Sequence, residues 1–322
     1  MKKKSFDPGA YLFADLGGTQ LRTAFRGERL VQASGTEAHV KDALRDVVGG
    51  RAVKGVVIAA AGPVARGACE LTNLGWTLTT AKLARWFAGA PCAILNDVEA
   101  QGYGALSVGP ASRVRWSGPA KDPGGVRPTM LIVPGTGIGA ALLLDDAVPR
   151  VFPTETGHAS YGPNIGVGRD YANHVREHDG MATIETALAG RAFSQLFHFF
   201  EHEEPKFSTK AERAKVTAAS DPNRAIVELA REGSNAARIV VGAYATFLAE
   251  EVRNAALRCG GDVWLAGGIV NALAPALRRS IKAVFAEPHP MSKWLSRVRV
   301  CHVPEVDLGL VGCSAFAKLM QG

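Results

Sequence analysis

The stretch from Leu12 to Arg22 constrains the fold of this chain more than any other part of it. It consists of an apolar strand that ends in Asp15, a turn at Gly17, Gly18 and Thr19, and a second strand. Glycines in a tight turn can take positive φ and let backbone N–H groups approach an anion, and a carboxylate beside them can hold a hydrated cation. The stretch therefore predicts a phosphate-holding β-hairpin. An ordinary hairpin, whose glycines only form the turn, stays open as the alternative.

Two further glycine turns come directly after apolar strands. They contain Gly135, Thr136 and Gly137 in the middle of the chain and Gly267 and Gly268 towards its end. Together with the first hairpin, these turns suit a single phosphorylated ligand. None of them has the Lys of a P-loop or the full spacing of a dinucleotide-binding fingerprint. Three unrelated turns remain the alternative interpretation.

An Asn–Asp pair lies where an apolar strand passes into a helix. Asn96 and Asp97 follow the strand over 93–95, and α/β folds place reactive side chains at such strand ends. Asp97 can accept the proton of a substrate hydroxyl while that oxygen attacks phosphorus, and Asn96 can orient the same substrate. The alternative is that one of these two residues only caps the helix.

Three more polar side chains favour a substrate with several hydroxyl groups. Glu155 and His158 lie in a loop that contains Pro and Gly, and Glu185 lies near a helix start. A sugar hydroxyl can donate to a carboxylate and accept from an imidazole, so this set suits a sugar. Taken singly, Glu185 is also typical of a solvated helix residue, and His158 of a loop histidine with a local hydrogen bond.

Length and residue pattern favour two lobes. Single cores rarely grow far beyond roughly 250 residues, and this chain has 322, of which 47% are hydrophobic and 21% charged. Short apolar runs alternate with helical patterns in the first hundred residues, which predicts an α/β lobe with a mixed sheet. The predicted strands are 10–15, 20–25, 53–59, 129–133, 140–144, 263–269 and 298–303. The predicted helices are 37–48, 79–87, 182–201, 224–257, 271–284 and 308–320, and 110–128 is predicted to be a loop.

Charge and cysteine usage restrict the class of ligand. The formal net charge of +7 is spread along the chain and favours anionic small molecules, and no DNA-binding signature accompanies it, so no nucleic-acid partner is expected. The N-terminus has no sustained apolar region, which predicts a cytoplasmic protein without membrane contact. The five cysteines lack zinc-like spacing and are expected to be small buried hydrophobes.

The ordered set of motifs resembles the bacterial glucokinase family of the hexokinase-like, actin/Hsp70-type ATPases, in the branch without the zinc site of the repressor–kinase group. The resemblance spans almost the whole chain. It rests on Asp15–Thr19 with Arg22, Leu95–Asp97, Gly135–Gly139, Glu155 and His158 with Tyr161–Pro163, Glu185, Ala266–Ile269 and Gly309–Gly312.

This resemblance implies a fold and an activity. The fold is α/β, a two-lobed actin-like ATPase (ribonuclease H-like) fold with a smaller α/β lobe, 1–107 plus 306–322, and a larger α+β lobe, 108–305, around a cleft. The implied reaction is the ATP-dependent phosphorylation of glucose at its C6 hydroxyl, the entry to glycolysis, which gives glucose 6-phosphate and ADP. Asp97 would be the general base, and Asn96, Asp97, Glu155, His158 and Glu185 would bind the sugar.

The resemblance also implies ATP with Mg²⁺ between the lobes and a cytoplasmic homodimer. Asp15 would hold the Mg²⁺ through water. The residues implied to hold the nucleotide are Asp15, Gly17, Gly18, Thr19, Gly135, Thr136, Gly137, Gly267 and Gly268.

Two residues depart from the family pattern. Gln20 stands where the family usually has Asn, which bears on the phosphate donor, and Thr156 stands where the sugar loop usually has Gly, which bears on the preferred sugar. A kinase for another hexose or an amino sugar is therefore an alternative. A second alternative is a sugar-sensing regulator without turnover, which would have no need of Asp97.

Overall fold

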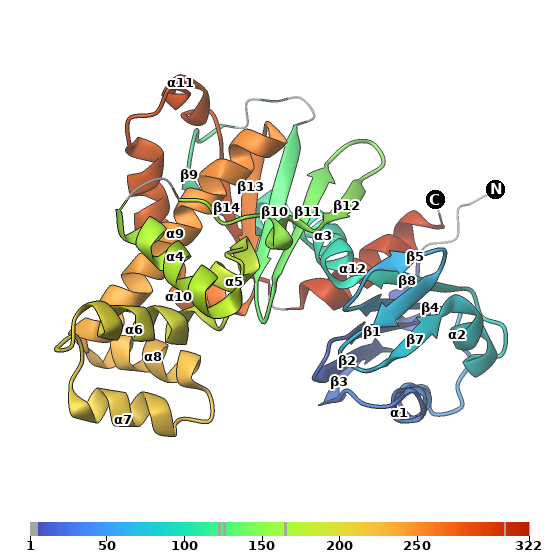
Figure 1. Cartoon of the computed structure of the whole chain (residues 1–322). Coiled ribbons are helices and arrows are strands. Elements are labelled where there is room, and N and C mark those ends of the chain that lie inside the picture. Colours follow the sequence, from blue (N-terminus) through green and yellow to red (C-terminus); the bar gives the residue numbers. More distant parts are fainter. Residues whose placement is uncertain (1–5, 122–123, 125–126, 164–165, 306, 322) are drawn as a thin grey trace. The chain divides into compact units, whose positions relative to one another are not determined.

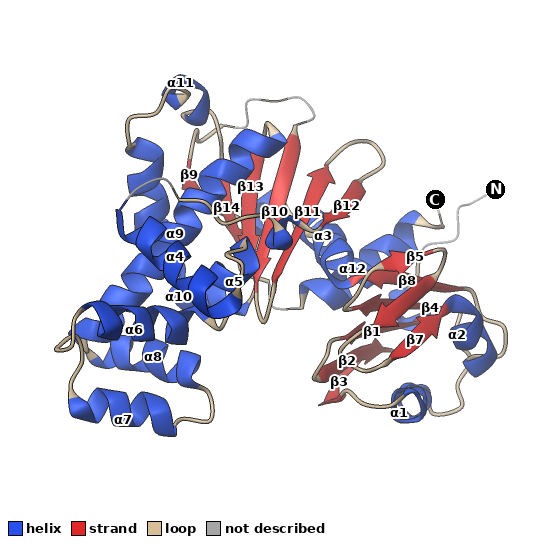
Figure 2. Cartoon of the chain, in the orientation of Figure 1, coloured by secondary structure: helices blue, strands red, loops and turns tan. Residues whose placement is uncertain are grey.

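The computed structural model describes residues 6–121, 124, 127–163, 166–305 and 307–321. The chain divides into two compact units, each with helices and strands (Figures 1 and 2). Unit 1 contains Met1–Pro110, Leu143–Pro153 and Glu305–Gly322, and unit 2 contains Ala111–Leu142 and Thr154–Pro304. The sequence places Leu143–Pro153 in the larger lobe, whereas its contacts group it with unit 1.

A five-stranded sheet with the order β3-β2-β1-β4-β8 forms the centre of unit 1. Strands β1, β4 and β8 are parallel, and β2 and β3 are antiparallel to their neighbours, so the predicted mixed sheet with a hairpin start is confirmed. The strands are β1 (Tyr11–Leu16), β2 (Gln20–Phe25), β3 (Glu28–Ala33), β4 (Gly55–Ala60) and β8 (Cys92–Asn96). A small antiparallel sheet consists of β5 (Val64–Ala65), β6 (Ala68–Leu71) and β7 (Trp76–Thr79).

Helices cover both faces of the five-stranded sheet because successive side chains of a strand point to opposite sides. Leu12 and its alternate neighbours in β1 join a core with α1 (Glu37–Val48) and α2 (Thr80–Trp86). Phe13 joins a separate core with α3 (Asp97–Ser107) and α12 (Leu308–Leu319).

Helices α3 and α12 meet through glycines. A Cβ atom added to Gly312 would lie 1.6 Å from the carbonyl oxygen of Ala100, and one added to Gly104 would lie 2.3 Å from that of Leu308. The two backbones therefore touch directly, which no larger residue at these two positions allows.

Unit 2 contains most of a six-stranded sheet with the order β12-β11-β10-β13-β14-β9. Strands β10, β13 and β14 are parallel, and β9 pairs antiparallel with β14 at the edge. The strands are β9 (Val114–Ser117), β10 (Pro128–Pro134), β11 (Ile138–Leu144), β12 (Arg150–Thr154), β13 (Asp262–Ala266) and β14 (Val300–Val303). The helices are α4 (Gly166–Asp179), α5 (Ile184–Leu188), α6 (Ala192–Glu203), α7 (Lys210–Ala218), α8 (Pro222–Glu232), α9 (Asn235–Cys259), α10 (Gly268–Ala286) and α11 (Ser292–Leu295).

Three predictions for unit 2 are wrong in detail. The predicted loop over 110–128 contains the strand β9. The predicted helix over 182–201 is split into α5 and α6 at Gly190, whose N–H donates to the carbonyl oxygen of Gly135 at 2.7 Å. The predicted helix over 224–257 is split at Gly233, which ends α8 with a left-handed φ of 106°.

No helix within the described ranges combines the length and the apolar character that crossing a membrane requires.

Candidate functional site

The first glycine turn connects β1 to β2. The N–H of Gly17 donates to the carbonyl oxygen of Gln20 at 2.9 Å, and the hydroxyl of Ser34 donates to the carbonyl oxygen of Gly17 at 2.6 Å. Neither Gly17 nor Gly18 has a positive φ, so the expected left-handed geometry is wrong here. A Cβ on Gly18 would lie 3.2 Å from Asn73 Nδ2. Close approach, and not positive φ, is thus what favours glycine at this position.

Asp15, the residue before the last of β1, lies in an electrostatically unusual place. Its side chain is 18% exposed, and burial raises the pKa of its carboxyl to about 6. Arg22, whose Nη1 lies 3.6 Å from Asp15 Oδ2, lowers this pKa, while the charges of Asp97 and Asp307 raise it further. The first turn of α12 lies close to the same carboxyl group, since a Cβ atom added to Gly309 would lie 2.8 Å from Asp15 Oδ2. Unit 1 therefore brings Asp15 and Asp97 close enough to interact.

Asn96 caps helix α3. Its Oδ1 accepts from the N–H groups of Val98 at 3.0 Å and Glu99 at 3.2 Å, and its Nδ2 donates to the carbonyl oxygen of Gly62 at 2.9 Å. The capping alternative is therefore confirmed for Asn96. The second amide proton has no partner among the described residues, so a contact with sugar stays a prediction.

Asp97 is the first residue of α3. Its Oδ1 accepts from the N–H of Val98 at 2.9 Å. A carboxylate at a helix N-terminus is stabilised by the unpaired N–H groups there and by the helix dipole. The fold thus places this carboxyl group at the carboxyl end of β8, with Oδ1 held by the backbone N–H of Val98.

In unit 2, Glu185 is held against the second glycine turn. Its Oε2 accepts from the N–H of Ile138 at 2.9 Å, and a Cβ on Gly137 would lie 2.4 Å from the same atom. A Cβ on Gly157 would lie 2.7 Å from the carbonyl oxygen of Ile138 and 3.6 Å from Glu185 Oε2. One cluster therefore contains Glu185, the second glycine turn and the loop around Gly157. From the sequence, only the family resemblance assigned these parts to a common site.

Glu155 directly precedes a short 3₁₀ turn, Thr156–His158, and His158 is the last residue of this turn. Their side chains are 80% and 65% exposed, and Glu155 Oε2 lies 3.8 Å from His158 Nε2. Two open polar groups at this spacing can contact neighbouring hydroxyls of one ligand. The Thr156 hydroxyl lies 3.0 Å from that of Thr154, so it is turned towards its own loop.

A pocket of about 720 Å³ lies in unit 2 between α6, α8 and α10. Gly135, Thr136 and Gly268 line it, so the second and third glycine turns come together at one site. Gly267 precedes α10 with a left-handed φ of 96°, which favours glycine there. The other lining residues are Pro134, Gly190, Arg191, Phe193, Asp221, Asn223, Arg224, Val227, Glu228, Arg231, Ile269, Ala272 and Leu273.

The wall that α8 contributes to this pocket was not predicted from the sequence. Asn223, Val227 and Arg231 are spaced four residues apart and share one face of α8. This spacing is a weak signal, because it is also typical of any amphipathic helix.

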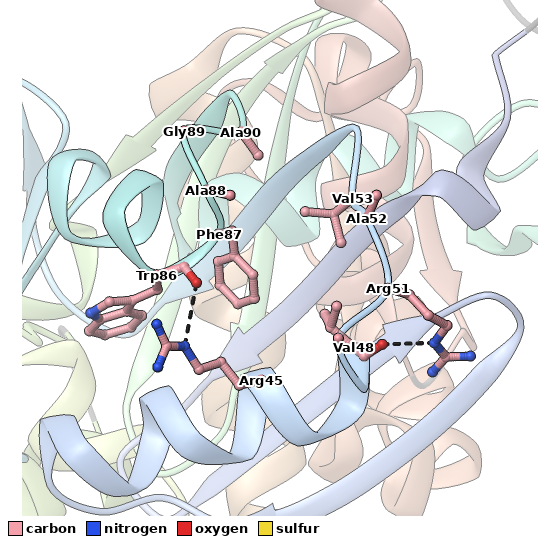
Figure 3. A pocket seen from close by; sticks show the side chains of 11 residues that line it. Arg45, Val48, Arg51, Ala52, Val53, Trp86, Phe87, Ala88, Gly89 and Ala90 are labelled. Atoms are coloured by element: carbon pink, nitrogen blue, oxygen red, sulfur yellow. Dashed lines mark hydrogen bonds between the residues drawn. The ribbon is translucent and has the colours of Figure 1, made fainter.

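A second pocket, of about 650 Å³, lies in unit 1 between the ends of α1 and α2 (Figure 3). Its two arginines bind carbonyl oxygens at the ends of helices. Arg45 donates to the carbonyl oxygen of Trp86 at 3.4 Å, and Arg51 donates to that of Val48 at 2.7 Å. Some of its lining residues come directly before β4 and β8 in the chain, so the pocket lies near the amino ends of these parallel strands. Asp15 and Asn96 lie near the carboxyl ends of the parallel strands. None of the predicted site residues lines it.

The predicted residues thus fall into two sets. Unit 1 holds Asp15, Gly17, Gly18, Thr19, Asn96 and Asp97. Unit 2 holds Gly135, Thr136, Gly137, Glu155, His158, Glu185, Gly267 and Gly268. Their joint action on one pair of ligands stays a prediction.

Sequence comparison finds similarity along most of the chain. The family model described as Glucokinase matches residues 12–320. A glucokinase-like protein of Xylella fastidiosa, strain Temecula1, is 29% identical over 324 residues, which cover 95% of this chain and 93% of that protein. A glucokinase of Synechocystis sp. is 27% identical over 281 residues, or 80% of this chain and 78% of that protein.

Solved structures share the fold. The glucokinase from Balamuthia mandrillaris in complex with glucose has a TM-score of 0.77 at 20% identity, covering 96% of this chain and 93% of that one. A ROK family glucokinase from Streptomyces griseus in complex with glucose and AMPPNP has a TM-score of 0.64 at 20% identity, covering 95% and 98%. The chain has the actin-like ATPase fold of these sugar kinases.

Proposed function

Because the chain belongs to the Glucokinase family, we propose that it transfers the γ-phosphoryl group of ATP to the C6 hydroxyl of glucose. The products are glucose 6-phosphate and ADP. The family match over residues 12–320 carries the proposal, because this range includes every predicted site residue. The Streptomyces griseus relative, solved with glucose and AMPPNP, supports the same pair of ligands.

Asp97 accepts the proton of the C6 hydroxyl in this proposal. Phosphoryl transfer needs little covalent help from the protein, so positioning and charge stabilisation supply most of the rate enhancement. A carboxyl group held at the start of α3 is the kind of side chain that can take up this proton. Asn96, Glu155, His158 and Glu185 orient the sugar hydroxyls, so that C6 is the reacting position.

The glycine turns bind the nucleotide. In unit 2, the pocket between α6, α8 and α10 takes the adenosine part, and the turns at Gly135 and Gly268 meet the phosphates at its mouth. In unit 1, Gly17, Gly18 and Thr19 supply further donors to the phosphates.

The surroundings of Asp15 fit a hydrated Mg²⁺. Asp15 is a largely buried carboxylate whose pKa is raised by burial and by Asp97 and Asp307, so a cation beside it offsets unfavourable charge. Mg²⁺ prefers oxygen ligands and keeps several of its waters, which suits contact through water. When bound, the ion neutralises charge on the transferred phosphoryl group. Asp15 would hold it from unit 1.

Substitution of Glu155 or His158 tests the sugar loop. We expect Glu155→Gln and His158→Ala to raise the KM for glucose at least about tenfold, because each removes a partner of a sugar hydroxyl. The KM for ATP should change less than twofold. Glu177→Gln, an exposed change on α4, is the matched control. Equal loss of affinity for both substrates would point to a folding defect and contradict the assignment.

Asp15→Asn should stabilise the protein without ligands. A folded-state pKa of about 6, above the ordinary 3.8, means that the folded protein binds more protons between these pH values. The free energy of unfolding of the wild type therefore falls as pH rises through this window, by about 3 kcal/mol in total. Urea unfolding at pH 7.5 should show most of this gain for Asp15→Asn, and unfolding at pH 4 little of it. The variant should bind Mg²⁺–ATP more weakly, and an equal stability at pH 7.5 would contradict the electrostatic account.

A kinase for another hexose or an amino sugar is the second candidate. Thr156 favours it, because this residue adds a side chain to the sugar loop where the family usually has Gly. ADP release with ATP and glucose, mannose, fructose or N-acetylglucosamine distinguishes the candidates. The highest kcat/KM should be with glucose, and no ADP release with any sugar would favour a non-catalytic regulator.

We also expect the protein to be a cytoplasmic homodimer that feeds glycolysis. The five cysteines are free, which suits a reducing compartment. Cell fractionation and light scattering of the purified protein test the two expectations.

A further inference from the structure

The side chain of Asn223 is locked in one orientation at the wall of the unit 2 pocket. Its Oδ1 accepts from the backbone N–H of Ser194 at 3.0 Å, and it shares the proton of the Ser194 hydroxyl, also at 3.0 Å, with the carbonyl oxygen of Arg191. A backbone N–H can only donate, so the atom that faces it must be the amide oxygen. The orientation of the amide is therefore set by the protein itself.

The other end of this amide has its donors available. Asn223 Nδ2 makes no hydrogen bond to the described residues, and it is not among their buried polar atoms that lack a partner. Because Asn223 lines the pocket, its amide N–H groups can serve a ligand there. A donor fixed in place by other bonds loses little entropy when it binds.

The rest of the wall suits a nucleoside. Val227, Ile269 and Leu273 give the pocket apolar sides, and Arg231 bridges α8 to α10 by donating to the carbonyl oxygen of Ala272 at 3.2 Å. Gly135 lies at the end of the pocket that is proposed to meet the phosphates, and its carbonyl oxygen accepts from the N–H of Gly190, just before α6. Ser194 lies four residues further along the chain, in the first turn of α6.

We propose that Asn223, held by Ser194, donates a hydrogen bond to the adenosine part of the bound nucleotide. The acceptor is a ring nitrogen of the base or an oxygen of the ribose. The inference rests on the proposed function in so far as that function makes ATP the phosphate donor.

Asn223→Asp tests this directly. The aspartate keeps an oxygen for both Ser194 donors and replaces only the NH₂ group by an acceptor. A negative charge in the first turn of α8 is favourable for the helix, so folding should be preserved. Adenosine is the probe, because it carries no phosphate for the new charge to repel. We expect calorimetry to show adenosine binding at least about tenfold weaker, with the KM for glucose unchanged.

Two further variants sharpen the result. Asn235→Asp makes the same chemical change in the first turn of α9, at an exposed residue outside the pocket, and should leave adenosine binding unaltered. Ser194→Ala leaves only the backbone N–H to hold Asn223 and should weaken binding two- to threefold. With 2′-deoxyadenosine or 7-deazaadenosine, the analogue that removes the difference between wild type and Asn223→Asp identifies the acceptor atom.

Equal adenosine affinity in wild type and Asn223→Asp would overturn the inference. So would weakened binding of inorganic triphosphate with unchanged binding of adenosine, which would place Asn223 at the phosphates. A wild type that binds adenosine through Asn223 but forms no glucose 6-phosphate would refute the proposed function alone.

Discussion

Replacement of Asp97 by alanine is expected to abolish glucose phosphorylation in practice, with kcat lowered roughly 10²–10⁴-fold. The variant has no carboxylate to take the proton of the attacking hydroxyl. Nucleotide binding should persist, because the unit 2 pocket lies far from Asp97 in sequence and is built by other elements. A coupled assay of ADP release, with calorimetry of ATP binding, makes the comparison.

Asp97→Asn separates chemistry from folding in the same experiment. An amide oxygen can still accept from the N–H of Val98, as Asp97 Oδ1 does at 2.9 Å, but the amide cannot take up a proton. It should be as inactive as Asp97→Ala. Asp46→Asn, an exposed change on α1, is the control and should retain full activity. Near-wild-type turnover in either Asp97 variant would remove this residue from the role of general base.

Gly312→Ala is expected to cause the largest loss of stability. Its new Cβ would lie 1.6 Å from the backbone carbonyl oxygen of Ala100, so α3 and α12 would have to separate. Overpacking of a core usually costs about 1–3 kcal/mol, and a clash with backbone that cannot rotate away should cost at least about 3 kcal/mol. Thermal unfolding followed by circular dichroism should show a clearly earlier transition.

Gly242→Ala is the matched control. Gly242 lies within α9, and a Cβ there would meet no atom within 4 Å. Alanine is a better helix former than glycine, so this change should stabilise the helix by about 0.5–1 kcal/mol. A Gly312→Ala protein as stable as wild type would show that the two helices do not depend on their backbone contact.

Local patterns predicted the elements well where local forces decide them. The strand over 20–25 and the helix over 37–48 are found with these bounds, because turn residues end the strand and Thr36 and Gly49 cap the helix. The break at Gly190 could not be predicted, because its N–H bonds to Gly135, 55 residues earlier in the chain. Strand β9 was missed because pairing with β14 makes it a strand in a stretch rich in Gly and Pro.

The candidate site was predictable to the extent that motifs mark strand ends and turns. Asp15, Asp97 and the glycine turns stand in such places. The contribution of Asn223 to the pocket wall was not predictable, since the orientation of its amide depends on Ser194 in another helix. Asn96 shows a further limit, because an Asn at a strand-to-helix junction predicts a helix cap as well as a substrate ligand, and the structure shows the cap.

The position of α12 also determines the order in which the chain can fold during synthesis. Every residue of unit 2 leaves the ribosome before α12, whereas β1 and α3 must wait for α12 to complete their core. Unit 1 therefore begins first and finishes last. Until α12 is made, the apolar side chains Phe13, Val57 and Leu95 lack part of their cover, which leaves apolar surface exposed on the nascent chain.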